Sequence, residues 1–166
     1  IDANKLFIEQ SNKAGLEAYE VNVYDDDLTD NIELNDIGYL IAMTGSDAVN
    51  NYAFKNLSKV FGDHGAFRLI SSEEVKSENF DQKHQYFTPK DDYINLSEAV
   101  RDYPKIHEIL LHSEDEFRTN LEKIHRKLQS IPLFIKTNNN IYLLSEIESK
   151  EISIENATLV YIGDKI

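Results

Sequence analysis

The stretch from Ile37 to Gly62 constrains the fold more than any other part of the chain. It opens with an apolar run, Tyr39 to Met43, whose length and composition are typical of a strand covered on both faces, as in a parallel sheet. Four small or polar residues follow. Apolar residues then recur at helical spacing up to Gly62, which is suited to end a helix. These apolar residues are Val49, Ala53, Leu57, Val60 and Phe61. The pattern predicts a strand, a tight turn and a helix.

The same alternation of elements continues on both sides of this stretch. A helix is expected over residues 3–14, a strand over residues 16–23, and a short helix with an acidic start over residues 25–34. Ala66 to Ile70 is a further short apolar strand. Helices that alternate with strands favour a parallel sheet with helices on its faces. We therefore predict a parallel α/β domain over residues 1–76.

The second part of the chain has a different pattern. Residues 77–95 are polar, and we interpret them as a connector whose aromatic residues serve as packing anchors. These are Phe80, Tyr86, Phe87 and Tyr93. Residues 96–166 then predict a short helix over 96–100, a strand, a helix that Ser113 and Glu116 would cap, and three more strands. The strands are expected over residues 106–111, 131–135, 141–144 and 158–162. This order predicts a small α+β domain.

Composition restricts the partners of the chain. Its 166 residues carry 30 acidic and 17 basic side chains, a net charge of −13. Such a surface repels phosphate backbones and anionic lipids, which disfavours nucleic acid, and no apolar run is long enough to insert into a bilayer. The absence of cysteine excludes disulfides and thiolate chemistry. The chain begins with Ile1, and its single methionine is Met43, so we interpret it as a piece of a longer protein.

No catalytic or metal-binding pattern stands out. The chain lacks a Gly-x-Ser-x-Gly elbow, a Gly-Lys-Ser/Thr phosphate loop and a His-Glu-x-x-His helix. His107 and His112 are assigned to one strand, but their odd separation puts them on opposite faces, and His125 completes no obvious metal site. The acidic loop beginning at Asp25 only partly fits a calcium loop, because Asp30 stands where the sharp turn needs glycine. We predict neither an enzyme nor a metal site.

Polar residues gather where the central strand meets its helix. Ligands of α/β sheets usually bind at the carboxyl end of a strand beside a helix N-terminus, because the N–H groups of the first turn are unpaired there. The candidate ligand-binding residues are Asp2, Asn22, Thr44, Gly45, Ser46, Asp47 and Asn50. For the turn, the alternative is a capped helix without a ligand. For Asp2, the alternatives are a helix N-cap and a carboxylate that ends a strand and binds a ribose hydroxyl.

Several of these marks together resemble a known family. They are Asp2 at a strand end, Asn22 after the next strand, Ala42-Met43-Thr44 at the end of the central strand, and Asp47 with Asn50 opening the helix. In this order they resemble the second half of a TrkA-N or RCK-type domain, the Rossmann-like regulatory module of bacterial potassium channels and cation transporters. The segment from Thr44 to Asn50, with Phe61-Gly62 after it, resembles the cytoplasmic tail of bacterial monovalent cation:proton antiporters. Residues 96–166 are loosely similar to the small C-terminal domain that follows such modules.

The chain also departs from the family. The Gly-x-Gly-x-x-Gly loop is absent, so the first strand and its glycine loop would lie upstream of Ile1. Val21-Asn22 replaces the family's Gly-Asp pair. The resemblance therefore implies a truncated Rossmann-like parallel sheet, followed by a small α+β domain of the RCK-C type.

The resemblance also implies a function. It indicates a soluble regulatory domain of a bacterial Na⁺/H⁺ antiporter, at the cytoplasmic face of the inner membrane and in one polypeptide with the transporter domain. Dimerisation or ligand sensing would control ion transport, and a homodimer is expected. The cofactor stays unknown: a nucleotide suits such a fold, but without the glycine loop this fragment has little with which to hold a dinucleotide. The alternatives are a fragment of a nucleotide-dependent oxidoreductase and a ligand-free assembly module.

Overall fold

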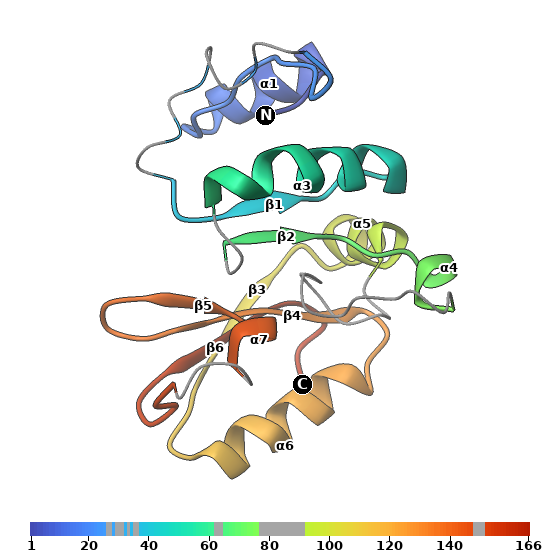
Figure 1. Ribbon diagram of the computed structural model, residues 1–166. Helices are drawn as coiled ribbons and strands as arrows, with labels where there is room; N and C mark the ends of the chain where they lie inside the picture. Colours follow the sequence, from blue (N-terminus) through green and yellow to red (C-terminus); the bar gives the residue numbers. More distant parts are fainter. Residues whose placement is uncertain are drawn as a thin grey trace.

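The computed structural model describes residues 1–25, 28, 32, 34, 37–61, 65–76, 92–147 and 152–166, and it places them in two sheets with flanking helices (Figure 1). The described helices are α1 (Lys5–Lys13), α3 (Asp47–Phe61), α4 (Ser72–Val75), α5 (Tyr93–Asp102), α6 (Glu114–His125) and α7 (Leu144–Ile147). The strands are β1 (Leu40–Ala42), β2 (Ala66–Arg68), β3 (Ile106–Leu110), β4 (Ser130–Lys136), β5 (Ile141–Leu143) and β6 (Thr158–Gly163). The fold is thus a mixed α/β fold. Most of the acidic helix expected over residues 25–34 lies outside the described residues, as does Gly62.

The central strand, turn and helix form as predicted. β1 pairs in parallel with β2, with Leu40 opposite Ala66 and Ala42 opposite Arg68, and α3 connects the two strands. Ala53 and Leu57 lie on the buried face of α3, as their helical spacing requires. β1 is shorter than the apolar run from Tyr39 to Met43, and Met43 is exposed beyond the end of the strand. The expected parallel pairing is confirmed for two strands.

The prediction of a strand over residues 16–23 is wrong. Leu16, which would face a core, is 63% exposed, and the extended structure is limited to one parallel bridge between Asp2 and Glu20. Val21 N–H donates to the carbonyl of Asp2 at 3.1 Å within this bridge. The apolar residues of this segment alternate imperfectly, so they cannot line one buried face of a sheet.

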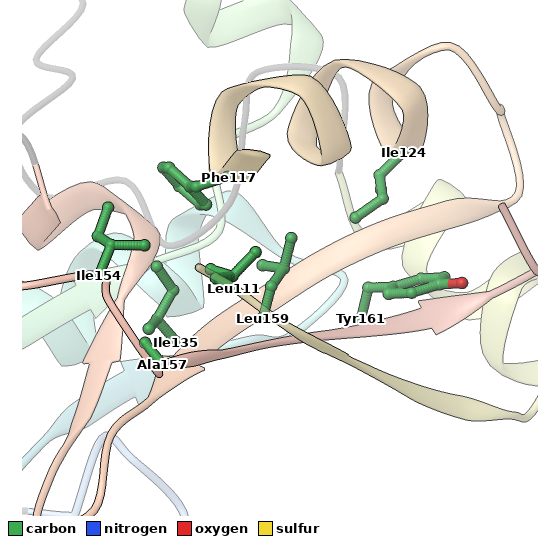
Figure 2. Packing of buried hydrophobic residues seen from close by; sticks show 8 residues of the cluster. All are labelled: Leu111, Phe117, Ile124, Ile135, Ile154, Ala157, Leu159 and Tyr161. Carbon is green, nitrogen blue, oxygen red and sulfur yellow. The ribbon is translucent and has the colours of Figure 1, made fainter. Parts of the chain in front are cut away.

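Residues 92–166 contain a four-stranded antiparallel sheet with the order β3-β6-β4-β5. One face of the sheet packs against α6, whose Phe117 and Ile124 point toward Leu159 and Tyr161 of β6 (Figure 2). The predicted start of α6 is confirmed, since Ser113 Oγ accepts a hydrogen bond from Glu116 N–H at 3.1 Å. The strands expected over this part are all present, with small changes at their ends.

The opposite face of this sheet packs against the N-terminal half of the chain. Phe67 and Leu69, at and after β2, share one buried cluster with Ala99 of α5 and with Ile131 and Ile162 of the sheet. Helix α5 begins at Tyr93, three residues before the expected start, and Asp92 caps it. The domain boundaries at residues 76 and 96 stay a prediction, and a common core crosses them.

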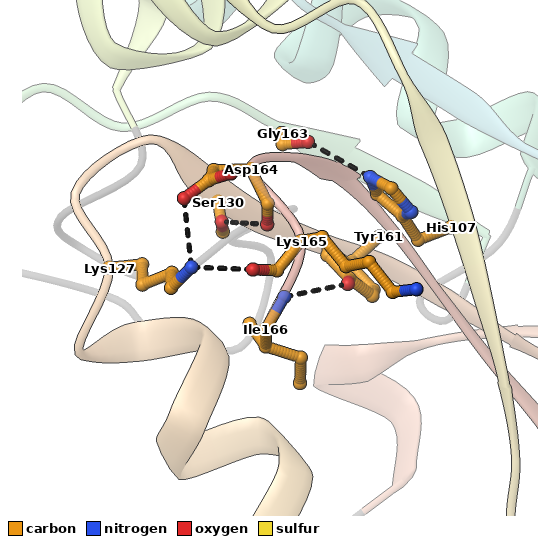
Figure 3. A network of polar contacts seen from close by, with 8 residues as sticks. All are labelled: His107, Lys127, Ser130, Tyr161, Gly163, Asp164, Lys165 and Ile166. Carbon is orange, nitrogen blue, oxygen red and sulfur yellow. Dashed lines mark hydrogen bonds and ion pairs between the residues drawn. The ribbon is translucent and has the colours of Figure 1, made fainter.

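Polar contacts hold the C-terminal residues against the antiparallel sheet (Figure 3). Lys127 Nζ lies 2.8 Å from Asp164 Oδ2, and this hydrogen bond lowers the pKa of the Asp164 carboxyl. Ser130 Oγ donates to the carbonyl of Asp164 at 2.8 Å. His107 stacks on the ring of Tyr161, with ring centroids 4.9 Å apart. The histidine therefore has a packing role in the sheet.

Candidate functional site

The turn from Thr44 to Asp47 joins β1 to α3 and is exposed. Ser46 closes the start of the helix: its Oγ accepts a hydrogen bond from Val49 N–H at 3.4 Å, and its carbonyl accepts from Asn50 N–H at 2.9 Å. Asp47 lies in the first turn of α3, where a carboxylate complements the positive end of the helix dipole. The turn therefore has the position that ligands of α/β sheets use.

Asn50 closes this turn from the inside. Its side chain is 1% exposed, and its Oδ1 accepts hydrogen bonds from the backbone N–H of Thr44 at 2.8 Å and from Thr44 Oγ1 at 2.9 Å. The Nδ2 group donates to the carbonyl of Thr44 at 2.9 Å. The Asn50 amide thus binds both the backbone N–H and the carbonyl of Thr44. This arrangement is the capped turn without a ligand, which the sequence left as an alternative. In this arrangement the Asn50 amide already has protein partners on both its oxygen and its nitrogen.

Tyr93 covers the turn from the other half of the molecule. A Cβ on Gly45 would lie 3.0 Å from Cε1 of Tyr93, so glycine allows the ring to approach the turn closely. Tyr93 is itself 46% exposed and forms the first residue of α5. Its role as a packing anchor of the connector stays a prediction, and the other three expected anchors lie outside the described residues. The sequence offered no signal that Gly45 would be its contact.

The side chains of Asp2 and Asn22 each form a hydrogen bond with a backbone N–H two residues later in the chain. Asp2 Oδ1 accepts a hydrogen bond from Asn4 N–H at 2.7 Å, and Asn4 is the residue that caps α1. The expected N-cap at Asp2 is therefore wrong, because the chain first pairs with Glu20 and enters the helix two residues later than expected. Asn22 Oδ1 accepts from Tyr24 N–H at 3.1 Å, a local turn. Binding of a ribose by Asp2 stays a prediction.

A buried carboxylate joins the two halves of the molecule close to β1. Glu146 of α7 is 3% exposed, and its Oε2 accepts hydrogen bonds from Leu143 N–H at 3.0 Å and from the Tyr39 hydroxyl at 3.1 Å. Burial and the adjacent Glu146 carboxylate raise the pKa of Tyr39 to about 12. The Tyr39 hydroxyl is thus held in its protonated form, as a donor, at neutral pH.

The structure also contains a surface depression of about 490 Å³ at the tip of the β4–β5 hairpin, which sequence reasoning missed. It contains none of the predicted site residues. Its lining residues are Thr137, Asn138, Asn139, Asn140, Tyr142, Ile152, Ser153, Glu155 and Asn156. Apart from Glu155, the lining carries no ionisable acid or base at neutral pH, so it offers no cation to an anionic ligand.

Among the described residues, no three His, Cys, Asp or Glu side chains gather closely enough to hold a metal ion. Across the same part of the chain, no helix combines the length and the apolar character that crossing a membrane requires. Comparison with protein-family models, with curated proteins and with solved structures finds no match. Ligand binding at the turn between β1 and α3 therefore stays a prediction.

Proposed function

We propose that this chain is a regulatory domain of a bacterial cation:proton antiporter of the Na⁺/H⁺ type. It would lie at the cytoplasmic face of the inner membrane, in one polypeptide with the transporter domain, and act as a homodimer. The observation that supports this proposal is the parallel unit β1–α3–β2, whose strand ends and helix N-terminus meet at an exposed turn. Such a unit fits a truncated Rossmann-like module, and the antiparallel sheet after it fits a small domain of the RCK-C type.

The contact between Gly45 and Tyr93 suggests how such a domain would transmit a signal. A ligand at the turn between Thr44 and Asp47 would lie beside the Tyr93 ring, which belongs to α5 and so to the other half of the molecule. Binding would change that contact. A ligand shifts the equilibrium between two conformations only if it binds them with different affinities, and a ring that must move provides such a difference.

A second candidate function is a ligand-free assembly module. The observation that favours it is the Asn50 amide, whose oxygen and nitrogen both form hydrogen bonds with Thr44. In that case the turn is only a well-capped helix start, and regulation would act through dimerisation alone. For a fragment of a nucleotide-dependent oxidoreductase, the described residues show no supporting cluster of catalytic groups.

Thermal-shift titrations separate these proposals. The ligands are NAD, NADH, ATP, ADP and AMP, each with and without magnesium or calcium. At about one hundred times its Kd, a ligand that binds only the folded state adds about 2.7 kcal/mol, which raises Tm by about 5–10 °C in a chain of this size. One nucleotide should give a saturable shift if the turn is a sensor. Absence of any shift would favour the assembly module.

A matched pair of variants locates the site. Asp47→Ala should reduce the shift, whereas Asp115→Ala, which removes another exposed carboxylate from the first turn of a helix, should leave it unchanged. Equal loss in both variants would place the ligand elsewhere. Asn50→Ala is a poor choice of variant because it removes the contacts that shape the turn. Sedimentation velocity tests the homodimer, which would have twice the 19.1 kDa mass of the chain.

A further inference from the structure

The depression at the tip of the β4–β5 hairpin has two walls, and both lie at one end of the antiparallel sheet (Figure 1). Lys136 of β4 is opposite Ile141 of β5 and opposite Thr158 of β6. The loop over residues 137–140 follows Lys136, and the segment over residues 152–156 leads to Thr158, so the register brings these two segments together. The space between them is about 490 Å³, which is within the range of small-molecule sites.

Backbone contacts hold both walls in place. In the hairpin loop, Thr137 N–H donates to the carbonyl of Asn140 at 2.9 Å, and Thr137 Oγ1 accepts from Asn140 N–H at 3.2 Å. In the other wall, Asn156 N–H donates to the carbonyl of Leu111 at 2.9 Å, and Ile154 is buried in the core of the sheet. The shape of the depression therefore does not depend on most of the polar side chains that line it.

The turn does not explain the asparagines at its tip. Asparagine is common in turns because it tolerates a positive φ and because its side chain binds nearby backbone groups. Among the described non-glycine residues, Asn156 alone has a positive φ, of 62°, so Asn138 and Asn139 do not use that tolerance. Both are exposed, and within the described ranges their side chains form no hydrogen bond. Each amide thus keeps two donors and one acceptor for a ligand.

Asn140 and Tyr142 supply a further donor and an apolar surface. Asn140 Nδ2 donates to the Tyr142 hydroxyl at 3.2 Å. A hydroxyl that accepts a hydrogen bond still has its own hydrogen to donate. Tyr142 is half-buried, and its ring lines the depression together with Ile152. A ligand would therefore meet an apolar surface surrounded by polar groups.

The charge of the lining restricts the ligand. Glu155 is the one lining residue that is charged at neutral pH, and the chain carries a net charge of −13. Such surroundings repel phosphates and other anions. The remaining polar groups are amides and hydroxyls, which both donate and accept hydrogen bonds. A neutral ligand with many hydroxyl groups and an apolar ring face matches this lining.

We propose that this depression binds a neutral saccharide. The amides of Asn138 and Asn139 would bind adjacent hydroxyl groups of the sugar, and the Glu155 carboxylate would accept a hydrogen bond from another hydroxyl. The Tyr142 ring would pack against the C–H groups of the sugar ring. The lining contains no residue of the turn between Thr44 and Asp47, so this proposal is independent of the proposed regulatory function.

Nuclear magnetic resonance titrations provide the test. The probes are glucose, galactose, mannose, N-acetylglucosamine and maltose, together with glucose 6-phosphate as an anionic sugar. At least one neutral sugar should cause saturable shift changes that are confined to residues 137–142 and 152–156, with a Kd of about 1 mM or lower. Glucose 6-phosphate should bind more weakly than the best neutral sugar, because the lining offers its phosphate no cation.

A double variant tests the role of the asparagines. Asn138→Ala combined with Asn139→Ala should weaken sugar binding by about tenfold or more, since several hydrogen bonds are lost. The Tm should stay unchanged, because these side chains have no partner within the described structure. Asn56→Ala, at an exposed asparagine of α3, is the control and should bind the sugar as the natural chain does.

Four results would overturn the proposal. The first is the absence of a saturable change with every neutral sugar, and the second is a change that maps to other residues. The third is a lower Tm of the double variant, which would show that the asparagines serve the fold of the hairpin. The fourth is tighter binding of glucose 6-phosphate than of any neutral sugar. Nucleotide binding is tested separately at Asp47, so either proposal can fail without the other.

Discussion

The two sheets of this molecule differ in how complete they are. The antiparallel sheet has four strands, and its central strand β6 is buried from Leu159 to Ile162, with α6 on one face and α5 and β2 toward the other. Within the described residues, the parallel sheet has two three-residue strands and many exposed apolar neighbours. Antiparallel strands can be joined by a short hairpin, as β4 and β5 are, whereas parallel strands such as β1 and β2 need a longer crossover, here through α3.

This difference predicts an uneven stability. Regions with few buried apolar contacts open locally at a lower free energy than the global unfolding of the protein. The parallel half should open first, and the antiparallel half should carry most of the free energy of unfolding. One buried cluster contacts both halves and couples their unfolding. It consists of Phe67, Leu69, Ala99, Ile131 and Ile162.

The largest expected effect comes from the core of the antiparallel sheet. Leu159→Ala removes a side chain that is 0% exposed near the start of β6, and it should lower the free energy of unfolding by about 3–5 kcal/mol. Leu57→Ala in α3 should cost about 2 kcal/mol, since its cluster is smaller. Urea denaturation followed by circular dichroism measures both. Leu128→Ala, at an 86% exposed position, is the control and should be nearly neutral. If Leu57→Ala and Leu159→Ala lower the free energy of unfolding equally, the two sheets do not differ in stability as proposed.

The end of β6 has a glycine that the fold requires. Gly163 has φ +125°, and a Cβ there would lie 1.9 Å from the carbonyl oxygen of Gln129. Gly163→Ala should therefore cost at least about 2 kcal/mol through strain and displacement of the β4 start. Gly38→Ala, just before β1, has no atom within 4 Å of the added Cβ and should be neutral or stabilising by up to about 1 kcal/mol. Thermal denaturation measures the stability of both variants. If Gly163→Ala is as stable as the natural chain, β6 does not require a glycine at this position.

A partly buried ion pair joins the parallel sheet to α4. Arg68 of β2 contacts Glu74 of α4 through two hydrogen bonds, and their side chains are 10% and 23% exposed. Glu74→Gln leaves the guanidinium without a charged partner and should cost about 1–2 kcal/mol. Glu122→Gln, which breaks an exposed pair with Arg126, should cost less than about 0.5 kcal/mol. Urea denaturation measures both variants. If their urea midpoints coincide, the Arg68–Glu74 pair is as weak as the surface pair.

The smallest effect concerns the hydrogen bond between the two halves. Tyr39→Phe removes the donor to Glu146 and should lower the free energy of unfolding by about 1 kcal/mol at neutral pH. The folded pKa of Tyr39, about 12, lies above its ordinary value of 10.0. This contribution is therefore complete below pH 10 and is lost as the pH rises through 12.

The pH dependence distinguishes Tyr39 from the other tyrosines. The stability difference between the natural chain and Tyr39→Phe should shrink between pH 10 and pH 12, as measured by denaturation at several pH values. Tyr24→Phe, at an exposed ring, is the control for the loss of a tyrosine hydroxyl. A difference that stays constant across this range would mean that the Tyr39 hydroxyl does not depend on Glu146.

Local patterns predicted the elements whose determinants lie within a few residues. The helical spacing of Ala53 and Leu57 and the cap at Ser113 identified α3 and α6, because both signals act inside one or two turns of helix. The strand expected over residues 16–23 failed for the opposite reason. A strand exists only if a neighbour pairs with it, and its apolar residues do not show whether that neighbour is present.

The sequence by itself thus determined the acidic, cysteine-free character of the chain, the strand-turn-helix around Thr44 and the positions of the strands along residues 96–166. Only the tertiary structure decided what the candidate site residues do. Asn50 fastens Thr44, Tyr93 covers Gly45, and Tyr39 reaches Glu146 over more than a hundred residues of sequence. The Asn50 contact spans six residues, and the sequence had left it open as a capped turn. The Tyr93 and Tyr39 contacts join residues far apart in the sequence, so their partners depend on how the elements pack and no local pattern predicts them.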